Sequence, residues 1–268
     1  MKFARESRPF VLPFLAAALG AFAWRRPAWG AGALLAGLLT LLFFRDPERR
    51  PAGPEEAVLA PADGLITRID RIGATPAEAA PDSRASPGGA GGTAAVATAG
   101  EAGPGGTLPP ELGAGAYHRI VTFLSVFDVH VQKVPVSGVV VASRHAAGRK
   151  MAAFRAAAGA ANEQHLSVIR RPDGDLVGVA QIAGLLARRV VCYLRPGDRM
   201  ERGQPMGLIK FGSRVDLLVP ASYRLLVARG DRVRNGATAV AVAEVPAAAP
   251  APGPRREATA GVPAGKAG

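Results

Sequence analysis

Cysteine, aromatic residues and acidic residues are all scarce in this chain, and each shortage limits what the protein can be. A single cysteine, Cys192, excludes an intramolecular disulfide and fits a reducing compartment for the folded part; its apolar neighbours predict a place in the core. Lys and Arg number 33 against 21 Asp and Glu, so the net charge of +12 favours an anionic partner, either nucleic acid or acidic lipid. Aromatic residues, at 6% of the chain, are sparse in the basic strands, and no basic recognition motif is present, so we predict no nucleic-acid partner.

The longest apolar stretches stand near the start of the chain, over 10–24 and 28–44, and neither contains a charged residue. Each is a little shorter than the ~20 residues that a helix needs to cross a bilayer unaided. We predict a transmembrane helical hairpin within residues 1–50, which either spans a locally thinned bilayer or re-enters it. A signal peptide is the main alternative. The second apolar stretch argues against it, because cleavage after the first would still leave a membrane segment.

Basic residues are more numerous at the two outer ends of this hairpin than in its loop. The loop holds Arg25 and Arg26, whereas the outer ends hold Lys2, Arg5, Arg8, Arg45, Arg49 and Arg50. By the positive-inside rule, both ends face the cytoplasm. We therefore predict a protein of the cell membrane, in contact with membrane lipid, whose folded domain lies on the cytoplasmic side.

Residues 51–245 consist mostly of short β-branched runs broken by Gly, Pro and Asp, which predicts a mainly β domain built as a barrel or sandwich. One short helix is predicted at Arg149–Ala161. The expected strands are Val58–Ala60, Gly64–Ile69, Ile120–Leu124, Val129–Val134, Gly138–Ala142, Leu166–Arg170, Leu176–Ile182, Arg189–Leu194, Met206–Phe211, Val215–Val219, Tyr223–Val227 and Ala239–Val245. Two segments rich in Gly, Ala and Pro have few large apolar residues, so we predict a disordered insertion at 72–116 and a disordered tail at 246–268.

The β-rich part contains two internal repeats. The pattern GDRxxxG occurs at 197–203 and again at 230–236, and PADGLI at 61–66 is echoed by PVSGVV at 135–140. Both patterns predict tight turns that lead into strands, with Gly at positive φ and Asp bonded within its own turn. The region 197–209 is similar to the hairpin of biotinyl and lipoyl carrier domains, whose modified lysine follows that hairpin. Ser213 stands at the corresponding position, which predicts an exposed turn there.

Gly212 and Ser213 form the pair with the most unusual chemical potential. Glycine leaves its carbonyl open to attack and tolerates a strained backbone, so the Ser213 hydroxyl can attack the Gly212 carbonyl. Elimination from the resulting ester gives dehydroalanine, and hydrolysis then leaves a pyruvoyl group at the start of a new chain. For the dipeptide alone, an ordinary turn is the simpler explanation.

Further motifs accompany this pair: FFRDPER at 43–49, PADG at 61–64, FLSVFDVHV at 123–131, QIAGLLARRVVC at 181–192 and KFGSRVD at 210–216. Together they closely resemble the small, archaeal-type class of phosphatidylserine decarboxylases, over 43–72 and 117–245. The resemblance implies self-cleavage between Gly212 and Ser213. The products are a β chain of residues 1–212 and an α chain of residues 213–268, which remain associated.

The same resemblance implies a carboxy-lyase that converts phosphatidylserine into phosphatidylethanolamine and CO2. Its covalent cofactor is a pyruvoyl group derived from Ser213, which forms a Schiff base with the substrate amine and makes an added cofactor unnecessary. We predict no metal, because the histidines lack metal-ligand spacing. A homo-oligomer is left open.

His130 is the predicted proton-transfer residue, because imidazole titrates near neutrality. Asp63 either orients a base or activates Ser213, or is a turn residue before Gly64. Larger family members carry a second histidine where this chain has Lys133, which is either a substitute base or a solvated strand residue. Candidate ligands of the substrate phosphate or carboxylate, with Arg214 preferred for its place beside Ser213, are Arg188, Arg189, Lys210 and Arg214.

The alternative is a membrane-tethered, carrier-like or binding β-barrel without catalysis. Denaturing electrophoresis separates the two hypotheses, since only the enzyme yields two fragments.

Overall fold

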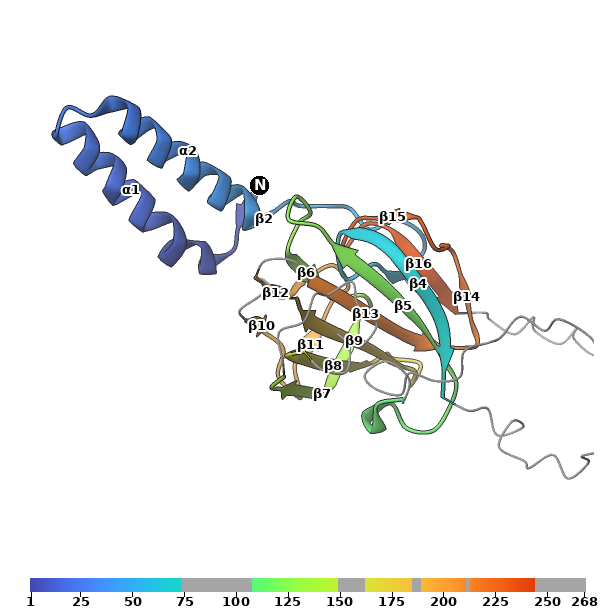
Figure 1. The fold of residues 1–268 in the computed structure, drawn as a ribbon. Coiled ribbons are helices and arrows are strands. Elements are labelled where there is room, and N and C mark those ends of the chain that lie inside the picture. Colours follow the sequence, from blue (N-terminus) through green and yellow to red (C-terminus); the bar gives the residue numbers. More distant parts are fainter. Residues whose placement is uncertain (74–107, 149–161, 185–188, 211–212, 244–268) are drawn as a thin grey trace, which may run out of the picture.

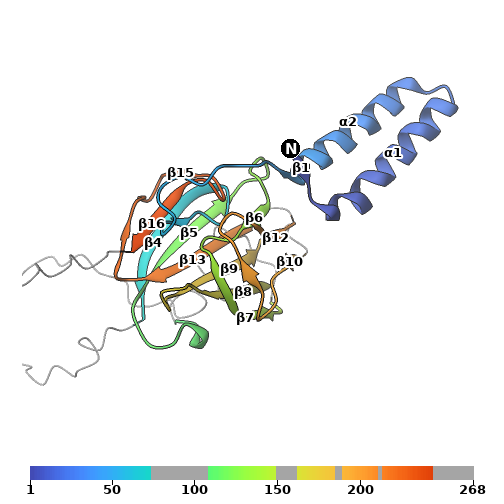
Figure 2. The same cartoon turned by 180° about the vertical axis from the view of Figure 1, so that it is seen from behind.

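The computed structural model describes residues 1–73, 108–148, 162–184, 189–210 and 213–243. A β-rich domain carries a helical hairpin that projects from one side of it (Figures 1 and 2). The predicted helix at Arg149–Ala161, the predicted tail at 246–268 and most of the predicted insertion lie outside the described residues. The mainly β character of the domain is confirmed.

The hairpin consists of α1 (Arg8–Ala23) and α2 (Pro27–Phe43), close to the predicted bounds. A proline stands in the first turn of each helix, where its missing N–H leaves no hydrogen bond unmade. A 3-10 turn, η1 (Arg5–Ser7), precedes α1, and β1 (Lys2–Phe3) pairs with β2 (Arg45–Asp46) to hold the two ends of the hairpin together.

The transmembrane part of that prediction is not supported. The helices have 16 and 17 residues. At 1.5 Å per residue they extend about 24–26 Å, less than the ~30 Å hydrocarbon core. Among the described residues, no helix has both the length and the apolar character required for a membrane span.

The main sheet is antiparallel and strongly curved (Figure 1), and every predicted strand overlaps an observed one in the main or smaller sheets. Its order is β11 (Arg199–Met200), β7 (Gly138–Ala146), β8 (Gln164–Arg170), β9 (Leu176–Ala183), β13 (Ser213–Pro220), β5 (Tyr117–Leu124), β4 (Gly64–Ile72) and β15 (Arg232–Val233). One smaller sheet has the order β10 (Val190–Cys192), β12 (Pro205–Ile209), β6 (Val131–Lys133). The other has the order β14 (Tyr223–Leu225), β16 (Ala239–Ala243), β3 (Val58–Leu59).

The internal repeat corresponds to real structural equivalence. Gly197 and Gly230 have φ values of 95° and 99°, and Asp198 and Asp231 each accept a backbone N–H from three residues earlier at 2.8 Å. The turns are therefore the ones that the repeated sequence predicts. They lead into β11 and β15, which form the two edges of the main sheet.

The two copies of the other repeat, PADGLI at 61–66 and PVSGVV at 135–140, are linked in a reciprocal way. The N–H of Leu59 donates to the carbonyl of Pro135, and the N–H of Lys133 donates to the carbonyl of Pro61, both at 2.9 Å. Each contact joins the short strand before one copy, β3 or β6, to the first residue of the other copy.

Strand β13 has two buried faces, and they pack against different apolar clusters. Val215, Leu217 and Val219 belong to the larger apolar core, whereas Leu218 belongs to a second cluster on the other side of the sheet. Because side chains alternate along a strand, Ser213 faces the larger core and Arg214 faces the opposite side.

The ends of the predicted insertion are ordered. Ile72 belongs to β4, and a 3-10 turn, η2 (Pro110–Leu112), precedes β5. Leu112 is 2% exposed in the second apolar cluster. The predicted disordered insertion, 72–116, was therefore too wide at both ends. Single apolar residues such as Ile72 and Leu112 are enough to pack the ends of a Gly- and Pro-rich stretch against the sheet.

Candidate active site

Ser213 opens β13 and is fully buried. The strand lies between β5 and β9, and Ser213 pairs with Leu124 on one side and Ala183 on the other. The Ser213 Oγ is buried and has no hydrogen-bond partner in the described part of the chain. The predicted exposed turn is wrong, because the apolar run that follows forms a central strand and Ser213 is part of it. Gly212 lies outside the described residues.

His130 is 1% exposed, and its tautomer follows from its one ring hydrogen bond. Nδ1 lies 2.9 Å from the backbone carbonyl of Asp128. A carbonyl only accepts, so Nδ1 carries the proton and Nε2 keeps a lone pair. Nε2 is buried and has no hydrogen-bond partner among the described residues. Burial lowers the pKa of His130 to about 4, so the imidazole is neutral at pH 7 and Nε2 is a proton acceptor.

The motif FxSxFDVH forms the turn that orients His130. The Asp128 carboxylate accepts hydrogen bonds from the Ser125 backbone N–H at 2.8 Å and the Ser125 Oγ at 2.7 Å. The His130 carbonyl accepts a bond from Ile209 N–H at 3.4 Å, and Ile209 stands four residues before Ser213. The strand that leads toward the Gly212–Ser213 bond is thus attached to the backbone of His130.

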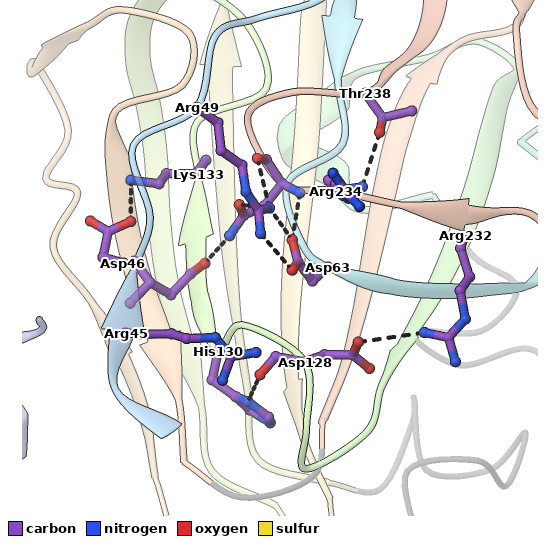
Figure 3. A network of polar contacts seen from close by, with 12 residues as sticks. Arg45, Asp46, Arg49, Asp63, Asp128, His130, Lys133, Arg232, Arg234 and Thr238 are labelled. Carbon is purple, nitrogen blue, oxygen red and sulfur yellow. Dashed lines mark hydrogen bonds and ion pairs between the residues drawn. The ribbon is translucent and has the colours of Figure 1, made fainter. Parts of the chain in front are cut away.

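Asp63 is held in a buried network (Figure 3). Both its oxygens accept from the Arg49 guanidinium, with Nη2 to Oδ2 at 2.9 Å, and Oδ1 also accepts from the Asn235 backbone N–H at 2.8 Å. Asn235 Nδ2 in turn donates to the Val131 carbonyl, next to His130. Among the described residues, no hydrogen bond joins Asp63 to His130 or Ser213. Asp63 is therefore connected, through Asn235, to the backbone beside His130.

Lys133 is not a solvated strand residue, which was one of the two alternatives that the sequence left open. Its Nζ lies 2.6 Å from Asp46 Oδ1, and both side chains are about nine-tenths buried. The sequence did not reveal this pair, because Asp46 is far away in the chain and joins the site only through β2.

Arg214 is not available to a substrate. Its guanidinium forms two hydrogen bonds to the Asp216 carboxylate, both 2.6 Å long, and both side chains are buried on the sheet face opposite Ser213. Adjacency in a strand gave the wrong expectation, since consecutive side chains point to opposite faces.

Lys210 and Arg189 line a cavity of about 460 Å³ together with His145, Glu163, His165, Val190, Val191 and Cys192. Arg189 and Lys210 also meet through their backbones, where the Lys210 N–H donates to the Arg189 carbonyl at 3.3 Å. This cavity lies at the end of β12 that leads toward Ser213, whereas a cavity of about 310 Å³ lies over the second apolar cluster and is lined in part by Arg119 and Asp216. Arg188 lies outside the described residues.

Comparison with known proteins decides the family. The family model for phosphatidylserine decarboxylase matches residues 37–241. The chain belongs to the phosphatidylserine decarboxylase family. Among its relatives, the phosphatidylserine decarboxylase proenzyme of Saccharopolyspora erythraea is 39% identical over 87% of this chain and 85% of its own length. That of Mycobacteroides abscessus is 40% identical, with 87% and 86% covered. A protein of Methanothermobacter thermautotrophicus that bears the name of an archaetidylserine decarboxylase proenzyme is 41% identical, with 74% and 78% covered.

Within this decarboxylase, the sequence did not identify three residues that the structure adds to the site: Phe43, Arg49 and Asn235. The Phe43 ring lies tilted against the His130 ring, and Arg49 and Asn235 bind Asp63. Phe43 and Arg49 belong to the motif FFRDPER, which contributed to the family resemblance although no role was assigned to its residues. Asn235 belongs to the second GDRxxxG copy, and Arg202 stands at the same position of the first copy. This difference between the copies was the sequence signal that could have identified Asn235.

Proposed function

We propose that this chain is a proenzyme that cleaves itself between Gly212 and Ser213 and then decarboxylates phosphatidylserine to phosphatidylethanolamine and CO2. The observation that carries the proposal is the buried, unpartnered Ser213 hydroxyl at the start of a central strand, in a chain that belongs to this decarboxylase family. A hydroxyl without a competing hydrogen bond is free to act as a nucleophile, and a neutral histidine is the base that such a step requires.

His130 supplies the proton handling. Among the described residues no hydrogen bond joins His130 Nε2 to Ser213 Oγ, so maturation requires the two atoms to come together before the Nε2 lone pair accepts the hydroxyl proton. The Asp128 carbonyl keeps the ring in the tautomer that this transfer needs. In turnover, the same Nε2 accepts a proton from the substrate ammonium group and later returns it to the carbon that has lost CO2. One histidine then serves both stages, which fits the replacement of the second histidine by Lys133.

The surroundings of Ser213 fit a pyruvoyl group. Conversion removes the hydroxyl and the amino nitrogen and leaves a small, uncharged keto group on a face lined by Val215 and Leu217. The Ser213 side chain gives up no hydrogen bond, because its Oγ has none among the described residues. When formed, the pyruvoyl group supplies an electron sink for the electrons of the departing carboxylate.

Lys210 and Arg189 are the candidates to bind the substrate phosphate. They line the same cavity, which lies near the strand end that leads to the cleavage site, and their charges suit a phosphodiester. The Lys210 Nζ also lies 5.0 Å from the centre of the Phe10 ring, at the start of the hairpin. A lipid headgroup bound between them would reach the site from the side on which the hairpin projects.

The α and β chains stay together after cleavage. Strand β13 belongs to the α chain and pairs along its length with β5 and for most of it with β9, both from the β chain. Strands β15 and β16 of the α chain pair with β4 and β3. Separation would expose the centre of the main sheet, so cleavage breaks one peptide bond without releasing the fragment.

We infer that the hairpin holds the domain at the cell membrane, and the basic residues at its outer ends favour the cytoplasmic side. Support comes from its exposed apolar side chains, which cover both helices: Leu12, Leu15, Leu19, Phe22, Leu34, Leu35, Leu38 and Leu39. Trp24 and Trp29, which are 84% and 76% exposed, lie near the loop, and such a surface is stable only when it is covered by lipid or protein.

The test is the fate of the Gly212–Ser213 bond. Purified wild-type protein should give two fragments on denaturing electrophoresis, and mass spectrometry should find a pyruvoyl group in place of serine at the start of the small one. Ser213→Ala should remain one chain without decarboxylase activity, while Ser222→Ala, an exposed serine in the same fragment, should mature normally. Normal cleavage in Ser213→Ala would refute the proposal, and an intact wild-type chain would favour the binding barrel.

A further inference from the structure

The segment from Phe43 to Arg49, which we call the connecting segment, joins the hairpin to the β domain and contacts three separate parts of the site (Figure 3). Arg45 Nη2 donates to the carbonyl of Phe127, in the turn before His130, at 2.5 Å. Asp46 binds Lys133, three residues after His130, and Arg49 binds Asp63. Three charged residues within five positions therefore hold the chain before His130, the chain after it and the turn that contains Asp63.

Phe43 covers His130 itself. The two ring centroids are 4.1 Å apart with an angle of 32° between the planes, and Phe43 is 7% exposed. Phe44 packs edge-on against Phe43 at 5.2 Å and belongs to the same buried cluster as Leu208, in the strand that leads toward Ser213. Phe10, from the start of α1, stacks on Phe44 at 5.5 Å. The base of the hairpin is thus an aromatic wall beside His130.

We propose that the connecting segment is a positioning element of the active site, in which Phe43 holds the His130 imidazole in place and excludes water from it. This inference rests on the proposed function, since it assigns a role within the same reaction. It makes the hairpin a requirement for the chemistry as well as for membrane contact, because its last helical residue forms one wall of the site.

In the described part of the chain, hydrogen bonds restrain the His130 ring only at one of its two nitrogens. Nδ1 has one bond, to the Asp128 carbonyl, and Nε2 has no partner among the described residues. A single hydrogen bond leaves the ring free to tilt about that bond, and stacking on Phe43 removes this freedom. The same contact replaces water over one face of the ring, and loss of water disfavours the charged imidazolium.

A purely structural role for Phe43 makes a different prediction. If Phe43 only attaches the hairpin, its replacement lowers stability or membrane binding and leaves the pH profile of turnover unchanged. The assay should therefore use full-length, matured enzyme in detergent with a short-chain, water-soluble phosphatidylserine, so that delivery of substrate from a membrane is not required.

The test compares Phe43→Leu with Phe22→Leu, the same change at a hairpin position that packs on Gly30 in α2. We expect Phe43→Leu to raise the midpoint of the acid limb of kcat from near 4 toward the ordinary imidazole range. At pH 5.5 this change would reduce kcat by up to roughly tenfold relative to its value at pH 8. Phe22→Leu should retain the wild-type profile. Phe43→Met, which preserves volume without a ring, provides a second test if the leucine variant folds poorly.

The outcomes separate the two proposals. A wild-type enzyme that matures but releases no CO2 from phosphatidylserine would refute the proposed substrate, whatever the variants do. An active wild type whose profile is shared by Phe43→Leu or Phe43→Met would overturn the positioning role. Failure of both variants to fold would also overturn it, because Phe43 would then be a residue of the fold alone.

Discussion

Acidification should leave most of the activity of the matured enzyme in place well below pH 6. Turnover requires the Nε2 lone pair of His130, which protonation removes. Burial, partly offset by the Asp128 carbonyl, lowers the pKa of His130 to about 4, so the neutral form persists until the pH approaches that value. Histidine in water has a pKa of about 6.5, so an exposed base would lose activity about 2.5 pH units earlier.

The size of the difference makes the measurement decisive. At pH 5.5 an imidazole with a pKa of about 4 is about 97% neutral, whereas one with a pKa of about 6.5 is about 9% neutral. The same shift appears in stability. Between these two values the unfolded state binds more protons, so the free energy of unfolding falls as the pH is lowered through this window. At about 1.4 kcal/mol per pKa unit, the full loss is roughly 3 kcal/mol.

Two assays check this expectation on the same sample. CO2 release from short-chain phosphatidylserine gives the acid limb of kcat, and ¹⁵N NMR of the histidine side chains gives the titration of His130 directly. His130→Gln identifies its resonance and should remove the corresponding part of the pH dependence of urea unfolding. A His130 resonance that titrates near 6.5 in the folded, matured enzyme would refute the reasoning, because the imidazole would then be hydrated.

Two further predictions concern charged residues of the site. Arg49→Met leaves the Asp63 carboxylate buried without its guanidinium, so we expect the free energy of unfolding to fall by about 3 kcal/mol in urea titrations; an unchanged midpoint would contradict this. Lys210→Gln should raise KM about tenfold with kcat unchanged, as expected for the loss of a charge-assisted contact of ~1.4 kcal/mol with the substrate. Arg214→Met should instead lower the melting temperature, because the buried Asp216 carboxylate is left without its partner. A raised KM in a stable Arg214→Met enzyme would reverse the two assignments.

Much of the fold could be predicted because its signals are local. Alternation and β-branched runs located the strands, and Gly with Asp at fixed spacing fixed the turns of both repeat copies. The two-residue strands β1, β2, β11 and β15 were missed, since a pair of residues has no detectable period. The bounds of helices α1 and α2 were predicted within about two residues, but both helices are shorter than the predicted membrane span requires.

The site was predictable as a set of residues and much less as an arrangement. Ser213 and His130 were identified from motifs, and the structure buries both. The role of Arg214 was misjudged, because adjacency along a strand places two side chains on opposite faces. The sequence left the place of Lys133 open because its partner, Asp46, lies in a different part of the chain.

By itself the sequence determined a helical hairpin, a β-rich body with an internal repeat, and the chemistry available at Gly212 and Ser213. These features depend on φ preferences, side-chain period and residue type, which act over a few neighbouring residues. Only the tertiary structure decided that Ser213 is buried, that Asp63 binds Arg49, and that Phe43 covers His130. Those contacts join residues far apart in the chain, and their free energy depends on burial, which no local pattern specifies.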